Sequence, residues 1–178
     1  RSVSRGLGDV YKRQEELKVY SGMLKALDRS VGRILDTLEK HNLTDNTLIV
    51  LTSDNGGANY IHLSDINKPY RGWKLTHFEG GLHVPFMAKW PNKIEPGIEF
   101  NAPIHANDIL PTFAAAAGAE LPDDRIIDGV NLLPFLQNHN SEMPHETLYW
   151  LQGRLQTVLH ENWKLITDHR TGKDWLFN

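Results

Sequence analysis

A long amphipathic segment that leads into a short apolar run constrains the fold most strongly. From Glu15 onward, apolar side chains recur mostly at steps of three and four residues, so they would form one stripe along a helix. After a polar break at 41–46, residues 47–52 form an apolar run with several β-branched members, typical of a strand buried on both faces. A helix leading into such a strand predicts an α/β fold, with a mixed, mainly parallel sheet flanked by helices. The apolar stripe consists of Tyr20, Met23, Leu24, Leu27, Val31, Ile34, Leu35 and Leu38.

The middle of the chain adds a second strand and a second helix. Residues 84–88 form another apolar run, and the proline at its second position predicts an edge strand or a strand start. Asn107 or Asp108 can cap a helix over residues 109–117. Gly118 is placed to end that helix, because glycine readily adopts the left-handed conformation at a helix terminus.

The last third of the chain predicts a small antiparallel sheet. Strand-like runs occupy residues 147–151, 155–160 and 163–167. Only Glu161 and Asn162 separate the last two runs, a spacing that suits a two-residue hairpin turn. We therefore expect an antiparallel subdomain over residues 126–178 that is incomplete at its C-terminus.

Two further ranges complete the predicted domain organisation. Residues 15–125 would form the C-terminal part of the α/β domain. Residues 1–14 show neither helical nor alternating apolar periodicity and resemble a non-native or unstructured leader.

Composition excludes several classes of partner. Lys and Arg total 19 against 22 Asp and Glu, a net charge of −3, so we expect no nucleic-acid binding because no strong basic field is available. No apolar run reaches the roughly 18 residues that span a bilayer, so membrane insertion is not expected either. The chain has no cysteine, which excludes disulfides, thiolate metal sites and a cysteine nucleophile within these residues.

Oxygen-bearing side chains follow the first predicted strand directly. Ligands in open α/β sheets bind beyond the carboxyl ends of strands, which is where Asp54 and Asn55 lie. A carboxylate and an amide oxygen favour Ca²⁺ or Mg²⁺, and Gly56 and Gly57 allow the backbone to turn sharply or approach a ligand. The alternative is that Asp-Asn-Gly-Gly is only a turn.

A basic, glycine-containing loop follows. Lys68, Arg71 and Lys74 could present positive charge to an anion held by the metal, lysine as a point charge and arginine as a planar fork. The alternative is a solvated basic loop. The nine histidines show no paired metal-binding spacing, and no Gly-x-Ser-x-Gly elbow or nucleotide-binding Gly-Lys-Ser/Thr loop is present.

Taken in order, these motifs resemble the sulfatase family, arylsulfatase-like members of the alkaline-phosphatase-like superfamily. The similarity covers nearly everything after residue 15 and is to the C-terminal portion of the family. The motifs are Ser53-Asp54-Asn55-Gly56-Gly57, Arg71-Gly72-Trp73-Lys74, Glu79-Gly80-Gly81, Val84-Pro85, Asp108-Ile109-Leu110-Pro111-Thr112, Asp128-Gly129-Val130-Asn131-Leu132 and Trp163-Lys164-Leu165-Ile166.

The resemblance implies a parent enzyme that hydrolyses sulfate esters, a sulfuric ester hydrolase. Asp54 and Asn55 would be two ligands of a Ca²⁺ ion. Lys74 would be both catalytic and substrate-binding, contacting the sulfate and the leaving oxygen, while Arg71, Gly56 and Gly57 would support the loop. The substrate would be a small sulfate ester or a sulfated carbohydrate, and the parent would be periplasmic or secreted.

The resemblance also implies that the nucleophile lies outside this chain. Family members use a formylglycine made within a Cys/Ser-x-Pro-x-Arg motif, and that motif is not present here. We therefore expect the fragment alone to be inactive. The alternatives are a phosphodiesterase or phosphonate hydrolase of the same superfamily, or a non-catalytic remnant.

Overall fold

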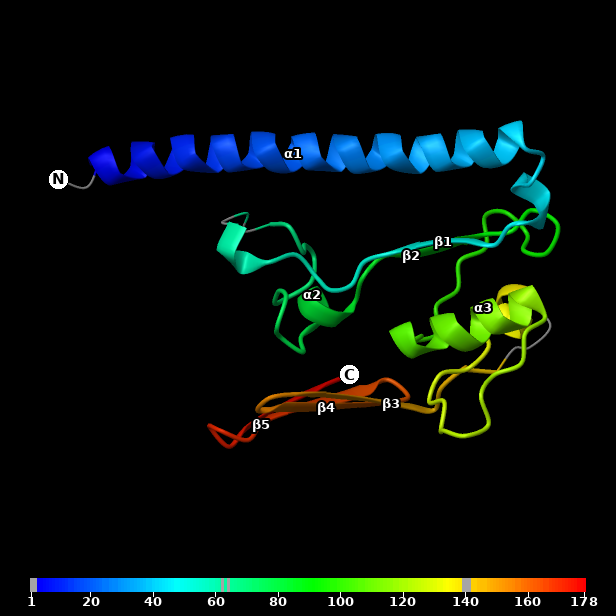
Figure 1. Ribbon diagram of the computed structural model, residues 1–178. Helices are drawn as coiled ribbons and strands as arrows, with labels where there is room; N and C mark the ends of the chain where they lie inside the picture. Colours follow the sequence, from blue (N-terminus) through cyan, green and yellow to red (C-terminus); the bar gives the residue numbers. More distant parts are fainter. Residues whose placement is uncertain (1–2, 62, 64, 139–141) are drawn as a thin grey trace. The chain divides into compact units, whose positions relative to one another are not determined.

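The computed structural model describes residues 3–61, 63, 65–138 and 142–178 of the chain (Figure 1). The chain forms two compact units, each made of two separate stretches of sequence. One unit comprises Arg1–Thr44 and Thr52–Pro85, and the other comprises Asp45–Leu51 and Phe86–Asn178. The α/β fold class is confirmed. The predicted boundary at residues 125 and 126, and the mainly parallel order of the larger sheet, stay predictions.

The first unit contains a long helix, α1 (Val3–Lys40). The helix begins at Val3 and not near Glu15, so it extends into residues 1–14, which the sequence analysis describes as a leader. Its apolar stripe is largely exposed, since the exposed fractions of Met23, Leu27 and Ile34 are 64%, 56% and 58%. No helix in the described part of the chain is long and apolar enough to cross a membrane.

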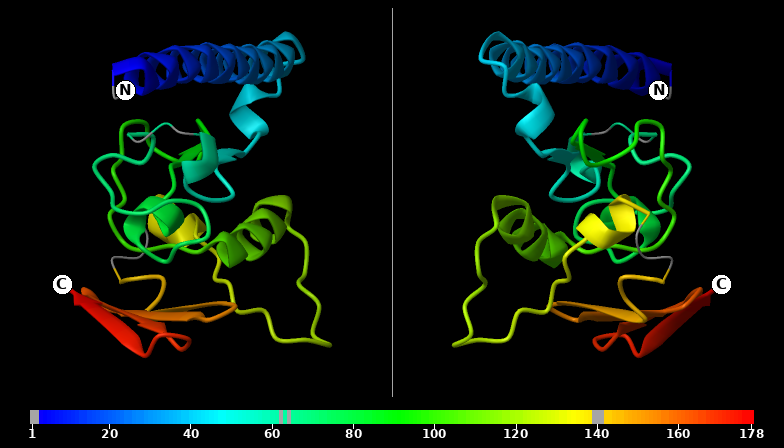
Figure 2. Two further views of the ribbon diagram at one scale, coloured as in Figure 1. Left: turned by 90° about the vertical axis from the view of Figure 1, so that its left-hand side faces the viewer. Right: turned by 90° about the vertical axis from the view of Figure 1, so that its right-hand side faces the viewer.

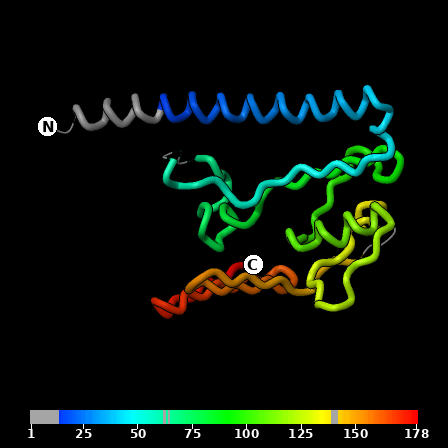
Figure 3. Tube along the Cα trace, in the orientation of Figure 1, coloured from blue at the N-terminus to red at the C-terminus, as the bar shows by residue number. Residues whose placement is uncertain are grey.

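The rest of the first unit is mainly loop. It holds the short helices η2 (Asn59–Ile61) and α2 (Glu79–Leu82). Figure 3 traces residues 53–61 and 65–85, which lie between the end of one strand and the start of the next.

Two short strands pair in a sheet of their own. They are β1 (Ile49–Thr52), which follows η1 (Thr44–Asn46), and β2 (Phe86–Lys89). Strand β2 begins directly after Pro85, as predicted from the proline. The prediction that the first strand is buried on both faces is wrong for this chain: β1 is half-buried at its start and exposed at Leu51 and Thr52, because β2 is its only paired strand among the described residues.

A small apolar core lies in the second unit beside helices α3 (Ile109–Ala117) and α4 (Leu133–Leu136). Gly118 ends α3 with a φ of 66°, in the left-handed conformation that the sequence predicts. The core consists of Trp90, Ile94, Leu132, Leu133 and Leu136, with Leu48, Phe86, Ala88, Phe100, Ile104, Ala116 and Val130 packed against it.

Asp108 precedes α3 but its side chain does not cap that helix. Its fully buried carboxylate instead accepts the His105 and Val130 backbone N–H groups, at 2.7 Å and 2.9 Å. The His145 side chain lies 2.9 Å from both carboxylate oxygens. The local cap is His105, whose side chain accepts the Asn107 N–H before η3 (Ala106–Asp108). Asp108 therefore joins three separate segments of the unit.

The C-terminal sheet is antiparallel, as predicted, and its strands follow one another in sequence order (Figure 2). It contains the three predicted strands and a fourth over Lys173–Phe177. In the register, His160 pairs with Trp163 across the predicted two-residue turn. One face carries buried Leu148 and Ile166, whereas Tyr149 and Leu151 on the other face are each 73% exposed. The strands are β3 (Thr147–Gln152), β4 (Leu155–His160), β5 (Trp163–Asp168) and β6 (Lys173–Phe177).

Candidate functional site

The loop after β1 presents oxygen atoms. Ser53 Oγ donates to the Asn55 carbonyl and the Asn55 N–H donates to Asp54 Oδ1, both at 2.9 Å. Asn55 Nδ2 donates to the Gly56 carbonyl at 2.9 Å. Among the described residues, Asp54 Oδ2 and Asn55 Oδ1 accept no hydrogen bond, and Asp54 is exposed while Asn55 is half-buried. The two oxygens fit the chemistry of a Ca²⁺ or Mg²⁺ ligand set.

Close packing of glycine backbones joins this loop to α2. The Gly56 N–H donates to the Gly81 carbonyl at 3.1 Å, and the Gly80 N–H donates to the Arg71 carbonyl at 2.7 Å. A Cβ atom at Gly56 would run into the Gly80 carbonyl group, with the carbonyl carbon only 2.7 Å away. The loop that carries the metal-ligand candidates and the loop that carries the cations therefore both pack against the glycine backbone of α2.

Lys74 is tied to the same loop by its backbone. Its N–H donates to the Gly57 carbonyl at 3.1 Å. The residue is half-buried, and Nζ has no hydrogen-bond or ion-pair partner within the described ranges. The structure thus brings the backbones of Lys74 and the Asp54–Gly57 segment together, although they lie on different loops.

The other two basic residues have local partners. The Arg71 guanidinium lies 4.0 Å from the centre of the Phe78 ring, a cation–π contact. Lys68 Nζ lies 3.0 Å from Asp65 Oδ2, and both side chains are largely exposed, so this ion pair contributes little to stability. Of the three cations, Lys74 is the one whose amine has no partner in the described part of the chain.

Two features of this region are missed by the sequence patterns. Asn67 hydrogen-bonds through its side chain to both loops, at Gly57 and Gly72. The His83 ring stacks on Tyr70 with centroids 4.5 Å apart, while its Nδ1 lies 3.0 Å from Glu79 Oε2. An asparagine two positions before a proline is a turn signal, but it does not reveal which backbone groups the side chain will reach.

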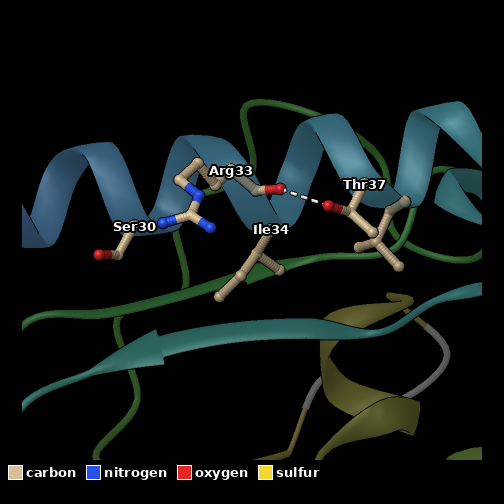
Figure 4. Close-up of a pocket in the computed structure, with 5 residues that line it drawn as sticks. Ser30, Arg33, Ile34 and Thr37 are labelled. Carbon is tan, nitrogen blue, oxygen red and sulfur yellow. Dashed lines mark hydrogen bonds between the residues drawn. The ribbon is translucent and has the colours of Figure 1, made fainter.

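A groove on the surface of α1 is not part of this site (Figure 4). Every residue that lines it comes from the one helix, and Thr37 Oγ1 donates to the Arg33 carbonyl within that helix at 2.7 Å. The lining contains none of the residues that the sequence singles out for chemistry. The lining residues are Ser30, Arg33, Ile34, Thr37 and Leu38.

Two models of known protein families match this chain. A family model described as Sulfatase matches residues 4–119. A second model, described as N-sulphoglucosamine sulphohydrolase, C-terminal, matches residues 72–176. The chain belongs to the sulfatase family. Both loops of the candidate site lie within the first matched range.

Individual relatives agree with the family assignment. Steryl-sulfatase of Rattus norvegicus is 43% identical over 136 residues, which is 73% of this chain and 24% of that protein. The chain thus spans about a quarter of the length of that sulfatase.

Solved structures share the fold. One described as the crystal structure of Ps i-CgsB in complex with k-i-k-neocarrahexaose has a TM-score of 0.81 and 37% identity, and the match covers 91% of this chain and 36% of that one. A phosphonate monoester hydrolase from Silicibacter pomeroyi matches with a TM-score of 0.67 and 21% identity, covering 85% of this chain and 32% of that one. At that identity the second likeness shows the fold alone.

Proposed function

We propose that the full-length parent of this chain hydrolyses sulfate esters, and that this chain supplies part of the site. The observation that carries the proposal is the hydrogen bond from the Lys74 N–H to the Gly57 carbonyl, because it joins the predicted cation to the predicted metal loop. Membership of the sulfatase family supports sulfate esters as the substrate class.

Asp54 and Asn55 would hold a Ca²⁺ ion through Asp54 Oδ2 and Asn55 Oδ1, which accept no hydrogen bond from the described residues. When bound, such an ion neutralises negative charge on the sulfuryl oxygens. Calcium takes about six to eight oxygen ligands, so further ligands would come from elsewhere in the parent. In the part of the chain that the structure describes, no three His, Cys, Asp or Glu side chains gather to hold a metal. The formylglycine nucleophile would likewise be supplied from outside this chain.

Lys74 would contact the sulfate group and the leaving oxygen. Cleavage of the sulfur–oxygen bond puts negative charge on the departing oxygen, and a fixed ammonium group stabilises that charge in the transition state. The half-buried position and the backbone bond to Gly57 hold the start of the side chain in place, while Nζ has no described partner that competes for it. Arg71 would support the loop instead, since its guanidinium contacts Phe78.

The substrate would be a small sulfate ester or a sulfated carbohydrate. The complex of Ps i-CgsB with k-i-k-neocarrahexaose, at 37% identity to this chain, supports the carbohydrate class. The competing activity is hydrolysis of a phosphonate monoester by the same fold, and comparison of the two ester classes in one assay separates them.

Replacing Asp54 by alanine is expected to weaken Ca²⁺ binding to the full-length parent by about tenfold or more, because the ion loses a charged oxygen ligand. Isothermal titration calorimetry with CaCl₂ measures the two affinities. Asp65→Ala is the matched control, because Asp65 is an exposed carboxylate of the same unit that pairs with Lys68. Equal Ca²⁺ affinity in wild type and Asp54→Ala would remove Asp54 from the metal site.

A further inference from the structure

The Asn67 side chain uses its whole amide group on backbone atoms of the two site loops. Its Oδ1 accepts the Gly57 N–H at 2.7 Å. Its Nδ2 donates to the Gly57 carbonyl at 2.9 Å and to the Gly72 carbonyl at 3.0 Å. Asn67 therefore links the end of the metal-ligand loop to the loop that carries Lys74.

The Gly57 carbonyl is the shared atom of this arrangement. It accepts both Asn67 Nδ2 and the Lys74 N–H, at 2.9 Å and 3.1 Å. The position of this oxygen consequently sets where the Lys74 backbone lies relative to Asp54 and Asn55. The same Asn67 Nδ2 also donates to the carbonyl of Gly72, two residues before Lys74.

Only a primary amide can make this set of bonds. The three bonds require one acceptor and two donors on a single side chain, which asparagine and glutamine possess and aspartate lacks. The space beside Gly57, the partner of Asn67, is also restricted, because a Cβ atom at Gly57 would lie 2.8 Å from the Ile66 side chain. Gly72 has a φ of 93°, in the left-handed region that favours glycine, and its carbonyl accepts the Asn67 amide.

We propose that Asn67 is a positioning residue that sets the distance between Lys74 and the Asp54–Asn55 loop. The inference rests on the proposed sulfate-ester hydrolysis for its catalytic consequence. Asn67 does not need to contact the substrate, because it acts through Gly57, Gly72 and the Lys74 backbone.

Kinetics of the full-length parent on nitrophenyl sulfate test the catalytic consequence. Asn67→Ala is expected to lower kcat by about 10- to 100-fold with KM changed less than about threefold, because a displaced Lys74 loses contacts made in the transition state. Asn67→Asp should be equally impaired, since a carboxylate cannot donate to the two carbonyls. Asn101→Ala, at an exposed site, should match wild type. Wild-type kcat in Asn67→Ala would overturn the proposal.

Amide hydrogen exchange of the same proteins provides a readout that does not depend on activity. In Asn67→Ala the Gly57 and Lys74 amides should exchange about tenfold faster or more. The Gly57 N–H loses its acceptor, and the Lys74 N–H donates to a Gly57 carbonyl that Asn67 no longer holds. In Asn67→Asp the Gly57 amide should stay protected, since the carboxylate still accepts it, while the Lys74 amide loosens. The amides of β5, in the other unit, should be unchanged.

The outcomes separate the inference from the proposed function. If the wild-type parent had no sulfatase activity, the proposed function would be wrong. The exchange pattern would still show whether Asn67 links the two loops. Unchanged exchange at Gly57 and Lys74 in Asn67→Ala would overturn the inference. Loss of protection in β5 as well, in both variants, would also overturn it, because Asn67 would then be a residue of general stability.

Discussion

Replacing Lys74 by alanine in the full-length parent is expected to lower kcat/KM for a sulfate ester by about 10²-fold or more, by analogy with the loss of one oxyanion donor. The backbone bond from Lys74 to Gly57 does not involve the side chain, so the loop should keep its place and the loss should report the ammonium group alone. Steady-state hydrolysis of nitrophenyl sulfate measures the effect.

Two variants sharpen this experiment. Lys68→Ala removes an exposed lysine from the same loop and should leave kcat/KM unchanged, because its amine is paired with Asp65. Lys74→Arg should recover little activity, since a planar guanidinium does not replace a compact ammonium at a single oxygen. An unchanged rate in Lys74→Ala would place Lys74 outside the site.

Gly56→Ala is expected to destabilise the parent by about 2–4 kcal/mol, because overpacking against backbone leaves no flexible side chain to move aside. The new Cβ would meet the carbonyl group of Gly80. Gly80 is itself held in place, because its N–H donates to the Arg71 carbonyl. Denaturant unfolding measures the free energy of unfolding, and the displaced metal loop should also lower Ca²⁺ affinity.

Gly32→Ala is the matched control. Gly32 lies in α1 with open space where its Cβ would be, so alanine should stabilise the helix slightly, by about 0.5–1 kcal/mol. A Gly56→Ala variant as stable as wild type would show that the Asp54–Gly57 segment does not pack against α2 through this glycine.

Features of the fold that depend on neighbouring residues can be predicted from the sequence. The helix end at Gly118, the hairpin turn at Glu161 and Asn162, and the strand start after Pro85 each follow from the conformational preference of one or two residues. The start of α1 is different. Its first residues lack an apolar stripe, but a helix once formed extends at little cost, so Val3 begins it.

Features that depend on distant backbone groups are not predictable in this way. The chemistry of Asp54, Asn55 and Lys74 follows from residue type and family resemblance. Asn67 was missed because its partners are main-chain atoms of Gly57 and Gly72, which no side-chain pattern encodes. Of the two predicted caps, Asn107 or Asp108, it is Asp108 that stands at the N-cap position of α3, but its side chain makes no cap bond to that helix and instead accepts the His105 N–H in the capping box of η3.

Tertiary contacts decide the role of Asp108. Its carboxylate contacts His145, 37 residues further along the chain, and the Val130 N–H, so it faces the fold instead of the helix that it precedes. Local capping preference is a weak effect compared with the cost of leaving a buried carboxylate without such partners.

The ester preference of the purified full-length parent, measured with Ca²⁺ present, decides between sulfate-ester and phosphonate hydrolysis. Nitrophenyl sulfate and a nitrophenyl phosphonate monoester, assayed under the same conditions, share a leaving group and differ in the group transferred. A sulfuric ester hydrolase should show a higher kcat/KM for the sulfate ester, and Lys74→Ala should lose that activity. A higher kcat/KM for the phosphonate, or no turnover of either ester, would contradict the proposed sulfate-ester hydrolysis.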